Sequence, residues 1–326
     1  MTCPAKEILF GVAISDALGV PYEFLSREQM NQDPARDVTG YGTHNQPPGT
    51  WSDDTSLTLC LAESLLDDYS LITVAEKFIQ WKNEAYWSAR GSVFDIGLTT
   101  SKAISRLEEI IDNRAFGKLE SLKDSAEEQD NGNGALMRIL PLIMEIQGQN
   151  ITEQFAIVWN NAALTHRHIR SAMCCMIYLK FAEYLILGID RAESYSRTQR
   201  DIIGLWEEIN FPECEKQHFK RIIQNDISSF PRNTIKSGGY VIESLEASLW
   251  CLLNSISFEK SVLEAINLGD DTDTTGAITG GIAALHFGYD ALPDYWVASL
   301  ARMEDIENLS DKLNEKYASH ESITNN

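Results

Sequence analysis

Helix-period hydrophobic patterns run along almost the whole chain, and they set the class of fold that it can adopt. Strict alternation of apolar and polar residues over five or more positions, which is typical of strands, is nearly absent. Apolar residues repeat at helical spacing over residues 57–66, 72–87, 99–111, 155–164, 169–187, 240–253 and 262–268. The sequence therefore predicts an all-α protein with about a dozen helices.

The segments between these patterns are short, which favours a single domain. At about 150 residues per domain, the chain of 326 residues makes one large domain or two small ones. The breaks at 46–49, 129–134 and 237–239 are rich in Gly, Pro or Asn, and a helical pattern resumes soon after each of them. We expect one domain over residues 1–316 and a polar, frayed tail over 317–326.

The charge balance narrows the partners that the chain can bind. Lys and Arg total 27 and Asp and Glu total 48, which gives a formal net charge of −21. Non-specific binding to nucleic acid or to an anionic membrane needs a basic surface, so we expect neither partner. The surplus of carboxylates fits a cation-binding enzyme, and it fits equally well an acidic surface that keeps a protein in solution.

Other features of the sequence indicate a cytoplasmic protein. No stretch approaches the about 18 apolar residues of a membrane span. Residues 1–16 lack the small-residue cleavage site of a secretory signal. The six cysteines form no C-x-x-C pair and have no metal-ligand spacing.

Two segments interrupt the helical pattern with clustered acids, and each runs into a predicted helix. Residues 49–55 read Gly-Thr-Trp-Ser-Asp-Asp-Thr, and residues 269–276 read Gly-Asp-Asp-Thr-Asp-Thr-Thr-Gly. On a regular helix Asp271 and Asp273 would point about 200° apart. They converge only if the backbone is irregular there, which the flanking glycines permit. Further along that helix, Gly280 indicates close packing against a neighbour.

Helix capping is the alternative to a cation site for these segments, because Asp, Ser and Thr are preferred N-cap residues. Capping needs one or two acids, whereas the two segments carry five acids and adjacent hydroxyls. Like charges this close are costly unless a cation neutralises them. If the segments meet, their all-oxygen ligands suit Mg²⁺, Mn²⁺ or Ca²⁺. An EF-hand is excluded, because Ile282 stands where that loop requires Glu.

Five segments of the chain resemble a known family, while common nucleotide and hydrolase motifs are missing from the sequence. The segments are GVAISDALGVPYE (11–23), SDDT (52–55), GNGALMR (132–138), LTH (164–166) and DTDT (271–274). They resemble the motifs of the ADP-ribosylglycohydrolases and occur in the same order. Residues 94–97 and 238–246 look most like the bacterial branch that reactivates dinitrogenase reductase. This chain has Ser15 and Ser52 where the family usually has Gly and Thr, and Ser52 keeps the hydroxyl.

The resemblance implies a single compact orthogonal helical bundle with a two-metal centre, formed by loops at helix N-termini. The cofactors would be two divalent cations, Mg²⁺ or Mn²⁺. Glu23 would be the catalytic acid or base, or a further ligand, and Asp95 a second catalytic candidate beside the leaving group. The implied metal ligands are Ser52, Asp53, Asp54, Asp271, Asp273 and Thr274.

Four further residues are substrate contacts by the same resemblance: Asn133, Gly134, His166 and Tyr240. Without the resemblance, each has an ordinary structural interpretation. Asn-Gly at 133–134 is typical of a plain turn. A His at a helix entrance is commonly a surface or capping residue, and Tyr240 is nearly as well explained as a core side chain.

The function that the resemblance implies is hydrolysis of the N-glycosidic bond between ADP-ribose and a protein side chain, with arginine preferred. The partners would be an ADP-ribosylated protein as substrate and ADP-ribose as product. One alternative keeps the fold and metals but acts on ADP-ribosyl-serine, O-acetyl-ADP-ribose or another ADP-ribose conjugate. Another alternative is an inactive ADP-ribose-binding or immunity protein. Retention of both acidic segments and Glu23 argues against inactivity.

Overall fold

The computed structural model describes residues 3–324, and its regular secondary structure consists of helices. Between residues 3 and 324 the extended pairing is limited to two isolated bridges, so the all-α prediction is confirmed. The helices are α1 (Ala5–Gly19), α2 (Arg27–Gln32), α3 (Asp53–Ser64), α4 (Leu71–Glu84), α5 (Leu98–Asp112), α6 (Ile143–Ile146), α7 (Ile151–Ala163), α8 (Ile169–Ile186), α9 (Arg191–Glu208), α10 (Glu213–Lys216), α11 (Lys220–Ile223), α12 (Val241–Asn254), α13 (Phe258–Ile266), α14 (Thr272–Phe287), α15 (Asp294–Ser299) and α16 (Met303–Thr324).

Most predicted helices lie where the hydrophobic periodicity placed them, and the differences are at their ends. The pattern over 72–87 predicted one helix, but α4 ends at Glu84. Ala85 and Trp87 adopt φ angles of 56° and 54°, in the left-handed region that stops a helix. The apolar residues after Glu84 therefore extend the hydrophobic pattern beyond the helix itself.

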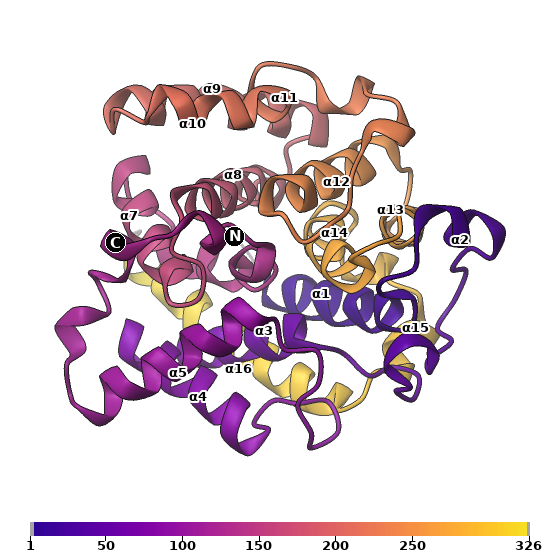
Figure 1. The fold of residues 1–326 in the computed structure, drawn as a ribbon, viewed down its shortest axis with the longest axis horizontal. Coiled ribbons are helices and arrows are strands. Elements are labelled where there is room, and N and C mark those ends of the chain that lie inside the picture. The colour runs from indigo at the N-terminus through magenta and orange to yellow at the C-terminus, as the bar shows by residue number, and fades with distance from the viewer. Residues whose placement is uncertain (1–2, 325–326) are drawn as a thin grey trace.

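Helices α1 and α14 pack in backbone contact at the centre of the fold (Figure 1). A Cβ atom on Gly280 would lie 1.9 Å from Ser15 Oγ and 2.3 Å from Gly11 O. A Cβ atom on Gly276 would lie 2.7 Å from Ser15 O. Only glycine fits so close an approach, so the close packing predicted for this helix is confirmed. The contact joins the first helix of the chain to a helix more than 250 residues later.

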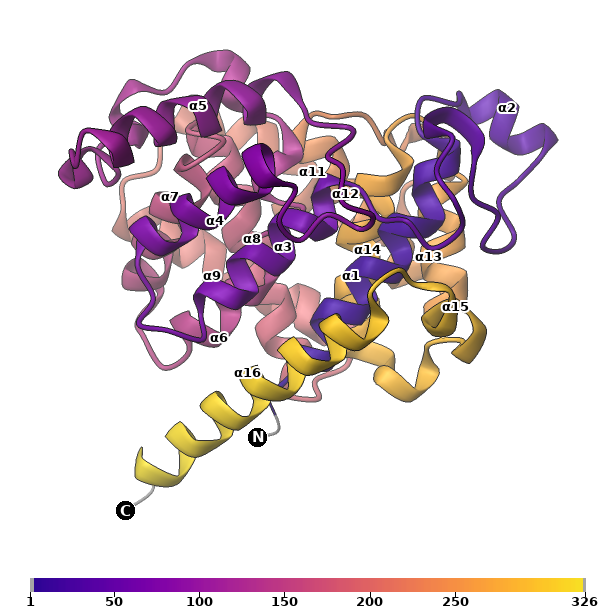
Figure 2. The same cartoon turned by 90° about the horizontal axis from the view of Figure 1, so that it is seen from below.

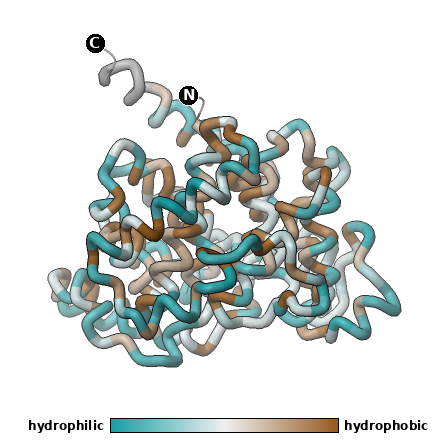
Figure 3. The backbone as a smooth tube through the Cα atoms, turned by 90° about the horizontal axis from the view of Figure 1, so that it is seen from above, coloured by the Kyte–Doolittle hydropathy of each residue, from teal (hydrophilic) through white to brown (hydrophobic). Residues whose placement is uncertain are grey.

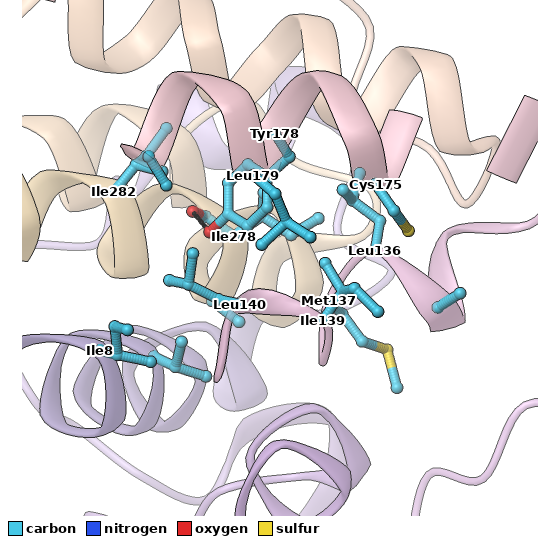
Figure 4. Packing of buried hydrophobic residues seen from close by; sticks show 14 of the residues in the cluster. Ile8, Leu136, Met137, Ile139, Leu140, Cys175, Tyr178, Leu179, Ile278 and Ile282 are labelled. Carbon is cyan, nitrogen blue, oxygen red and sulfur yellow. Dashed lines mark hydrogen bonds between the residues drawn. The ribbon is translucent and has the colours of Figure 1, made fainter. Parts of the chain in front are cut away.

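The hydrophobic core surrounds this pair of helices. Between Ala5 and Gly19, only Lys6 and Glu7 of α1 are not fully buried. Leu140 and Tyr178 pack with Ile278 of α14 in the core (Figure 4), and Tyr178 Oη donates to Ile278 O at 2.8 Å. Hydrophilic residues concentrate on the outer loops and helix faces (Figure 3).

The last helix, α16, projects from the body of the molecule (Figure 2). It continues without a break through residue 317, where we expected a polar tail to begin, and Tyr317 Oη donates to Glu145 Oε2 at 3.1 Å. Residues 325 and 326 of the expected tail lie outside the described range. Within that range, none of the helices combines the length and the hydropathy of a membrane span.

Candidate active site

The N-terminus of α3 is anchored from α1 by Asp16. The carboxylate of Asp16 is fully buried, and it accepts hydrogen bonds from Ser52 N at 2.9 Å and from Thr55 N at 3.0 Å. Burial raises the pKa of Asp16 to about 6, against the effect of these hydrogen bonds. The predictions gave Asp16 no role, although an acid within an apolar helix is a signal that could have identified it.

The segment before α14 has the irregular backbone that the spacing of its acids required. Gly269 and Asp270 have φ angles of 82° and 61°. Asp270 exchanges backbone hydrogen bonds with the segment after α1, since Phe24 N donates to Asp270 O at 2.7 Å and Asp270 N to Leu25 O at 2.8 Å. Asp271 is the N-cap residue of α14, but its side chain makes no capping hydrogen bond. Its carboxylate is therefore available for other contacts.

The two acidic segments meet, as the metal-site hypothesis requires. Thr274 Oγ1 donates to Asp54 Oδ2 at 3.2 Å across the junction. Carboxylate oxygens of Asp16, Asp54 and Asp273 lie within 4.8 Å of one another, and so do those of Glu23, Asp271 and Asp273. Asp273 belongs to both groups. Two adjoining sets of oxygen ligands are thus available for cations.

Unpaired buried oxygens distinguish this cluster from ordinary helix capping. Asp54 Oδ1 and Asp273 Oδ2 are buried and have no hydrogen-bond partner among the described residues. Burial raises the pKa of both carboxyl groups well above the usual range, and the neighbouring carboxylates add to the effect. A buried carboxylate without a partner is costly, and a divalent cation would remove that cost. The donor set therefore fits hard divalent cations.

Ser52 and Asp53 occupy different positions relative to this cluster. Ser52 is the N-cap of α3, because its Oγ accepts from Asp54 N at 3.3 Å, and the same hydroxyl donates to Asp54 Oδ2 at 3.0 Å. Among the described residues, Asp53 belongs to neither group of oxygens within 4.8 Å. Burial raises the pKa of Asp53, and the charges of Asp95 and the other neighbouring carboxylates raise it further.

A histidine that the sequence did not single out joins the two candidate catalytic acids. His44 Nε2 forms a short contact with Glu23 Oε2 and lies 4.0 Å from Asp95 Oδ1. Burial raises the pKa of Glu23, and Asp95 raises it further. Glu23, His44 and Asp95 form a third group of potential ligands. Nothing in the turn-rich segment around His44 marked it, because its position depends on a tertiary contact.

The predicted substrate contacts lie on and behind a glycine-containing loop. Asn133 Nδ2 donates to Asp271 Oδ2 at 2.8 Å and to Ser244 Oγ at 3.0 Å, so its amide holds one of the candidate ligands in place. A Cβ atom on Gly134 would lie 2.5 Å from His166 Cε1, which places His166 directly behind the loop.

The other two predicted contacts differ in their exposure. His166 is only 4% exposed, and burial lowers the pKa of its imidazole to about 3, so it is neutral at ordinary pH. Tyr240 is half-buried at the N-cap of α12, where its backbone pairs with Gly132. His166 therefore supports the loop from inside, whereas Tyr240 borders it from the exposed side.

Comparison with known proteins identifies the family to which the chain belongs. A family model described as ADP-ribosylglycohydrolase matches residues 5–322. The chain belongs to the ADP-ribosylglycohydrolase family. The protein is therefore a hydrolase, as predicted, and its all-α fold and pair of acidic loops accord with this membership.

Two relatives and one solved structure show how far the similarity extends. The chain is 34% identical over 313 residues to ADP-ribosylarginine hydrolase Tri1 of Serratia proteamaculans, covering 95% of this chain and 78% of the relative. It is 26% identical over 295 residues to ADP-ribosyl-[dinitrogen reductase] glycohydrolase of Rhodospirillum rubrum, covering 89% and 87%. A structure titled "ADP-ribosylglycohydrolase-related protein complex" matches with a TM-score of 0.75 and 26% identity, over 95% of this chain and 97% of that one.

The Ser15 departure from the usual family motif has a local structural counterpart. Its side chain is buried against α14, and Ser15 Oγ has no hydrogen-bond partner among the described residues. The hydroxyl occupies space that a side chain at Gly280 would fill. This ADP-ribosylglycohydrolase therefore accommodates a serine on α1 because α14 carries a glycine opposite it.

Proposed function

We propose that this protein removes ADP-ribose from arginine side chains of modified proteins, using two divalent cations, Mg²⁺ or Mn²⁺. The observation that carries the proposal is the convergence of unpaired, buried carboxylate oxygens from the starts of α3 and α14. Support for arginine comes from the Serratia relative, whose name specifies ADP-ribosylarginine, and support for a protein substrate comes from the Rhodospirillum relative, whose name specifies dinitrogen reductase. The acidic surroundings also suit a substrate that leaves as a basic guanidine.

The cations would be held by oxygens of both acidic loops. Asp273 belongs to both carboxylate groups, Asp54 to one and Asp271 to the other, so these three residues would hold the cations. The hydroxyls of Ser52 and Thr274, both directed at Asp54, complete the set together with Asp53. When bound, divalent cations supply positive charge that orients the hydroxyls of the distal ribose and polarises a water molecule.

Glu23 and Asp95 are assigned to proton transfer at the bond that breaks. A water oxygen bonds to the anomeric carbon, the carbon–nitrogen bond breaks, and its electron pair leaves with the guanidine nitrogen. Burial raises the pKa of Glu23 to about 10, so its carboxyl group holds a proton near neutral pH and gives it to the departing nitrogen. Asp95, whose side chain is 20% exposed and lies 4.0 Å from His44 Nε2, takes the proton of the water.

Release of ADP-ribose from an arginine-modified protein tests this proposal. The assay compares Mn²⁺, Mg²⁺ and a chelator, with serine-linked substrate in parallel. Asp273→Asn removes the shared ligand, and Asp68→Asn at an exposed position is the matched control. We expect metal-dependent release from arginine that Asp273→Asn abolishes and Asp68→Asn leaves unchanged. Release from serine alone would overturn the arginine assignment, and equal activity in chelator would overturn the metal centre.

A further inference from the structure

An aromatic cluster borders the two candidate catalytic acids at the surface. The ring of His44 lies between those of Phe24 and Phe94, with centroid distances of 6.1 Å and 5.4 Å. Phe24 follows Glu23 directly in the chain and is 68% exposed, while Phe94 precedes Asp95 and is partly buried. We call Phe24, His44 and Phe94 the aromatic rim.

The structure fixes the position of this rim in two ways. The turn that carries His44 is docked on the segment after α1, because a Cβ atom on Gly42 would lie 2.0 Å from Pro21 O. Thr43 Oγ1 also donates to Glu23 O at 2.7 Å. His44 therefore has a defined place without any ligand.

Phe24 is held at the surface by its backbone. Its φ angle of 66° lies in the left-handed region, which is strained for a bulky residue, and its N–H is bonded to Asp270 O. Packing in the core does not account for this conformation, because most of the side chain faces solvent. Strained residues that the surrounding structure fixes are characteristic of ligand-binding positions.

The chemistry of the rim matches one kind of side chain. Glu23 and Asp95 place carboxylates beside His44. Glu23 Oε2 is in short contact with His44 Nε2, and Asp95 Oδ1 lies 4.0 Å from the same nitrogen. Aromatic faces next to carboxylates favour a ligand that is both planar and cationic, and the guanidinium of arginine stacks on aromatic rings while it donates to carboxylates. A serine oxygen has neither a plane to stack nor a positive charge.

We propose that the aromatic rim receives the side chain that carries ADP-ribose and selects the guanidinium of arginine over the oxygen of serine. This inference rests on the proposed function and adds its specificity determinant. Phe24 supplies the exposed stacking face, and His44 is a positioning residue that spaces the two carboxylates. The predicted contacts of ADP-ribose, on the loop that carries Gly134, are not part of the rim, so we expect its affinity not to depend on the rim.

Steady-state kinetics of Phe24→Leu test the rim, because leucine keeps the apolar bulk but removes the aromatic face. We expect KM for an arginine-linked substrate to rise about 3- to 30-fold, as for the loss of a cation–π contact, with kcat changed less than twofold. KM for a serine-linked substrate and the affinity for ADP-ribose stay at their wild-type values. Phe24→Tyr restores the low KM, and Phe94→Leu serves as a second variant.

The matched control is Tyr295→Leu, which removes another exposed aromatic ring, on α15. It should change none of these constants. If the wild-type enzyme cleaves arginine-linked substrate and Phe24→Leu has the same KM, the rim is refuted while the proposed function stands. If wild-type enzyme cleaves only serine-linked substrate, the proposed arginine activity falls, and the selectivity falls with it. Equal loss in Phe24→Leu and Tyr295→Leu would likewise overturn the specific role of the rim.

Discussion

Replacing Asp54 by Asn should stabilise the metal-free protein and weaken the metal-bound one. Asp54 Oδ1 is buried without a partner, and its oxygens lie within 4.8 Å of those of Asp16 and Asp273. The amide keeps the acceptor for the hydroxyls of Ser52 and Thr274, which both donate to Asp54 Oδ2. It also places an N–H donor among acceptor oxygens. The substitution therefore removes repulsion without creating a cavity.

The size of the effect follows from the separation of the charges. Two unit charges 4.8 Å apart repel by about 3 kcal/mol at an effective dielectric constant near 20. Protons shared within the cluster reduce this value, so we expect metal-free Asp54→Asn to gain about 1–3 kcal/mol at pH 8, which raises Tm by a few degrees. In saturating Mn²⁺ the wild-type protein instead gains about 3 kcal/mol at a hundred times Kd, and the variant gains less.

The raised pKa of Asp54 also determines how the stability of the metal-free protein changes with pH. The pKa of Asp54 is raised in the folded state, so the folded protein binds more protons than the unfolded chain above about pH 4, and metal-free stability falls as pH rises. The advantage of Asp54→Asn should therefore vanish near pH 4.

Thermal unfolding in chelator and in Mn²⁺, from pH 4 to pH 8, measures the effects of this substitution. The exposed Asp68→Asn is the control, and it should behave as wild type. A lower Tm for Asp54→Asn in chelator would refute the reasoning from charge repulsion. An undiminished rise of Tm with Mn²⁺ would refute the assignment of Asp54 as a ligand.

Three further substitutions test other contacts. Gly280→Ala should cost about 1–3 kcal/mol in denaturant unfolding, because its Cβ would overlap Ser15 Oγ; wild-type stability would contradict the close packing. The buried imidazole of His166 has a pKa of about 3, so below pH 6.5 the unfolded chain takes up a proton that the folded protein does not, and this lowers wild-type stability by about 2 kcal/mol at pH 5. His166→Asn should remove this pH dependence; parallel curves of stability against pH for variant and wild type would contradict it. Asn133→Ala should weaken Mn²⁺ binding about tenfold in calorimetry, since its amide holds the Asp271 carboxylate in place and opposes the burial that raises the pKa of that group; unchanged affinity would exclude that role.

The helices and the acidic segments could be predicted from the sequence because both depend on local patterns. Apolar periodicity reports the buried face of a helix, and clustered acids at a helix start are visible in a single stretch of sequence. The irregular backbone before α14 was likewise predictable, because Asp271 and Asp273 cannot converge on a regular helix.

Contacts between distant segments could not be predicted in the same way. His44 reaches Glu23 only because Gly42 fits against Pro21, and no periodic pattern reports such a fit. Asn133 stays a predicted substrate contact, but the hydrogen bond from its amide to Asp271 was not predictable, since it depends on the pairing of its loop with the segment before α12. Sequence patterns indicated which residue types carry the chemistry, and tertiary packing determined their partners.

The backbone contact between α1 and α14 affects how the protein folds during its synthesis on the ribosome. Helix α1 is apolar on nearly every side, and the helix that covers it is made more than 250 residues later. Until then, the emerging chain exposes the hydrophobic surface of α1 and contains only one of its two acidic loops, and exposed hydrophobic surface of this kind is bound by chaperones. Synthesis of α14 both covers α1 and supplies the second acidic loop, so the nascent polypeptide has no complete acidic cluster until that helix has emerged.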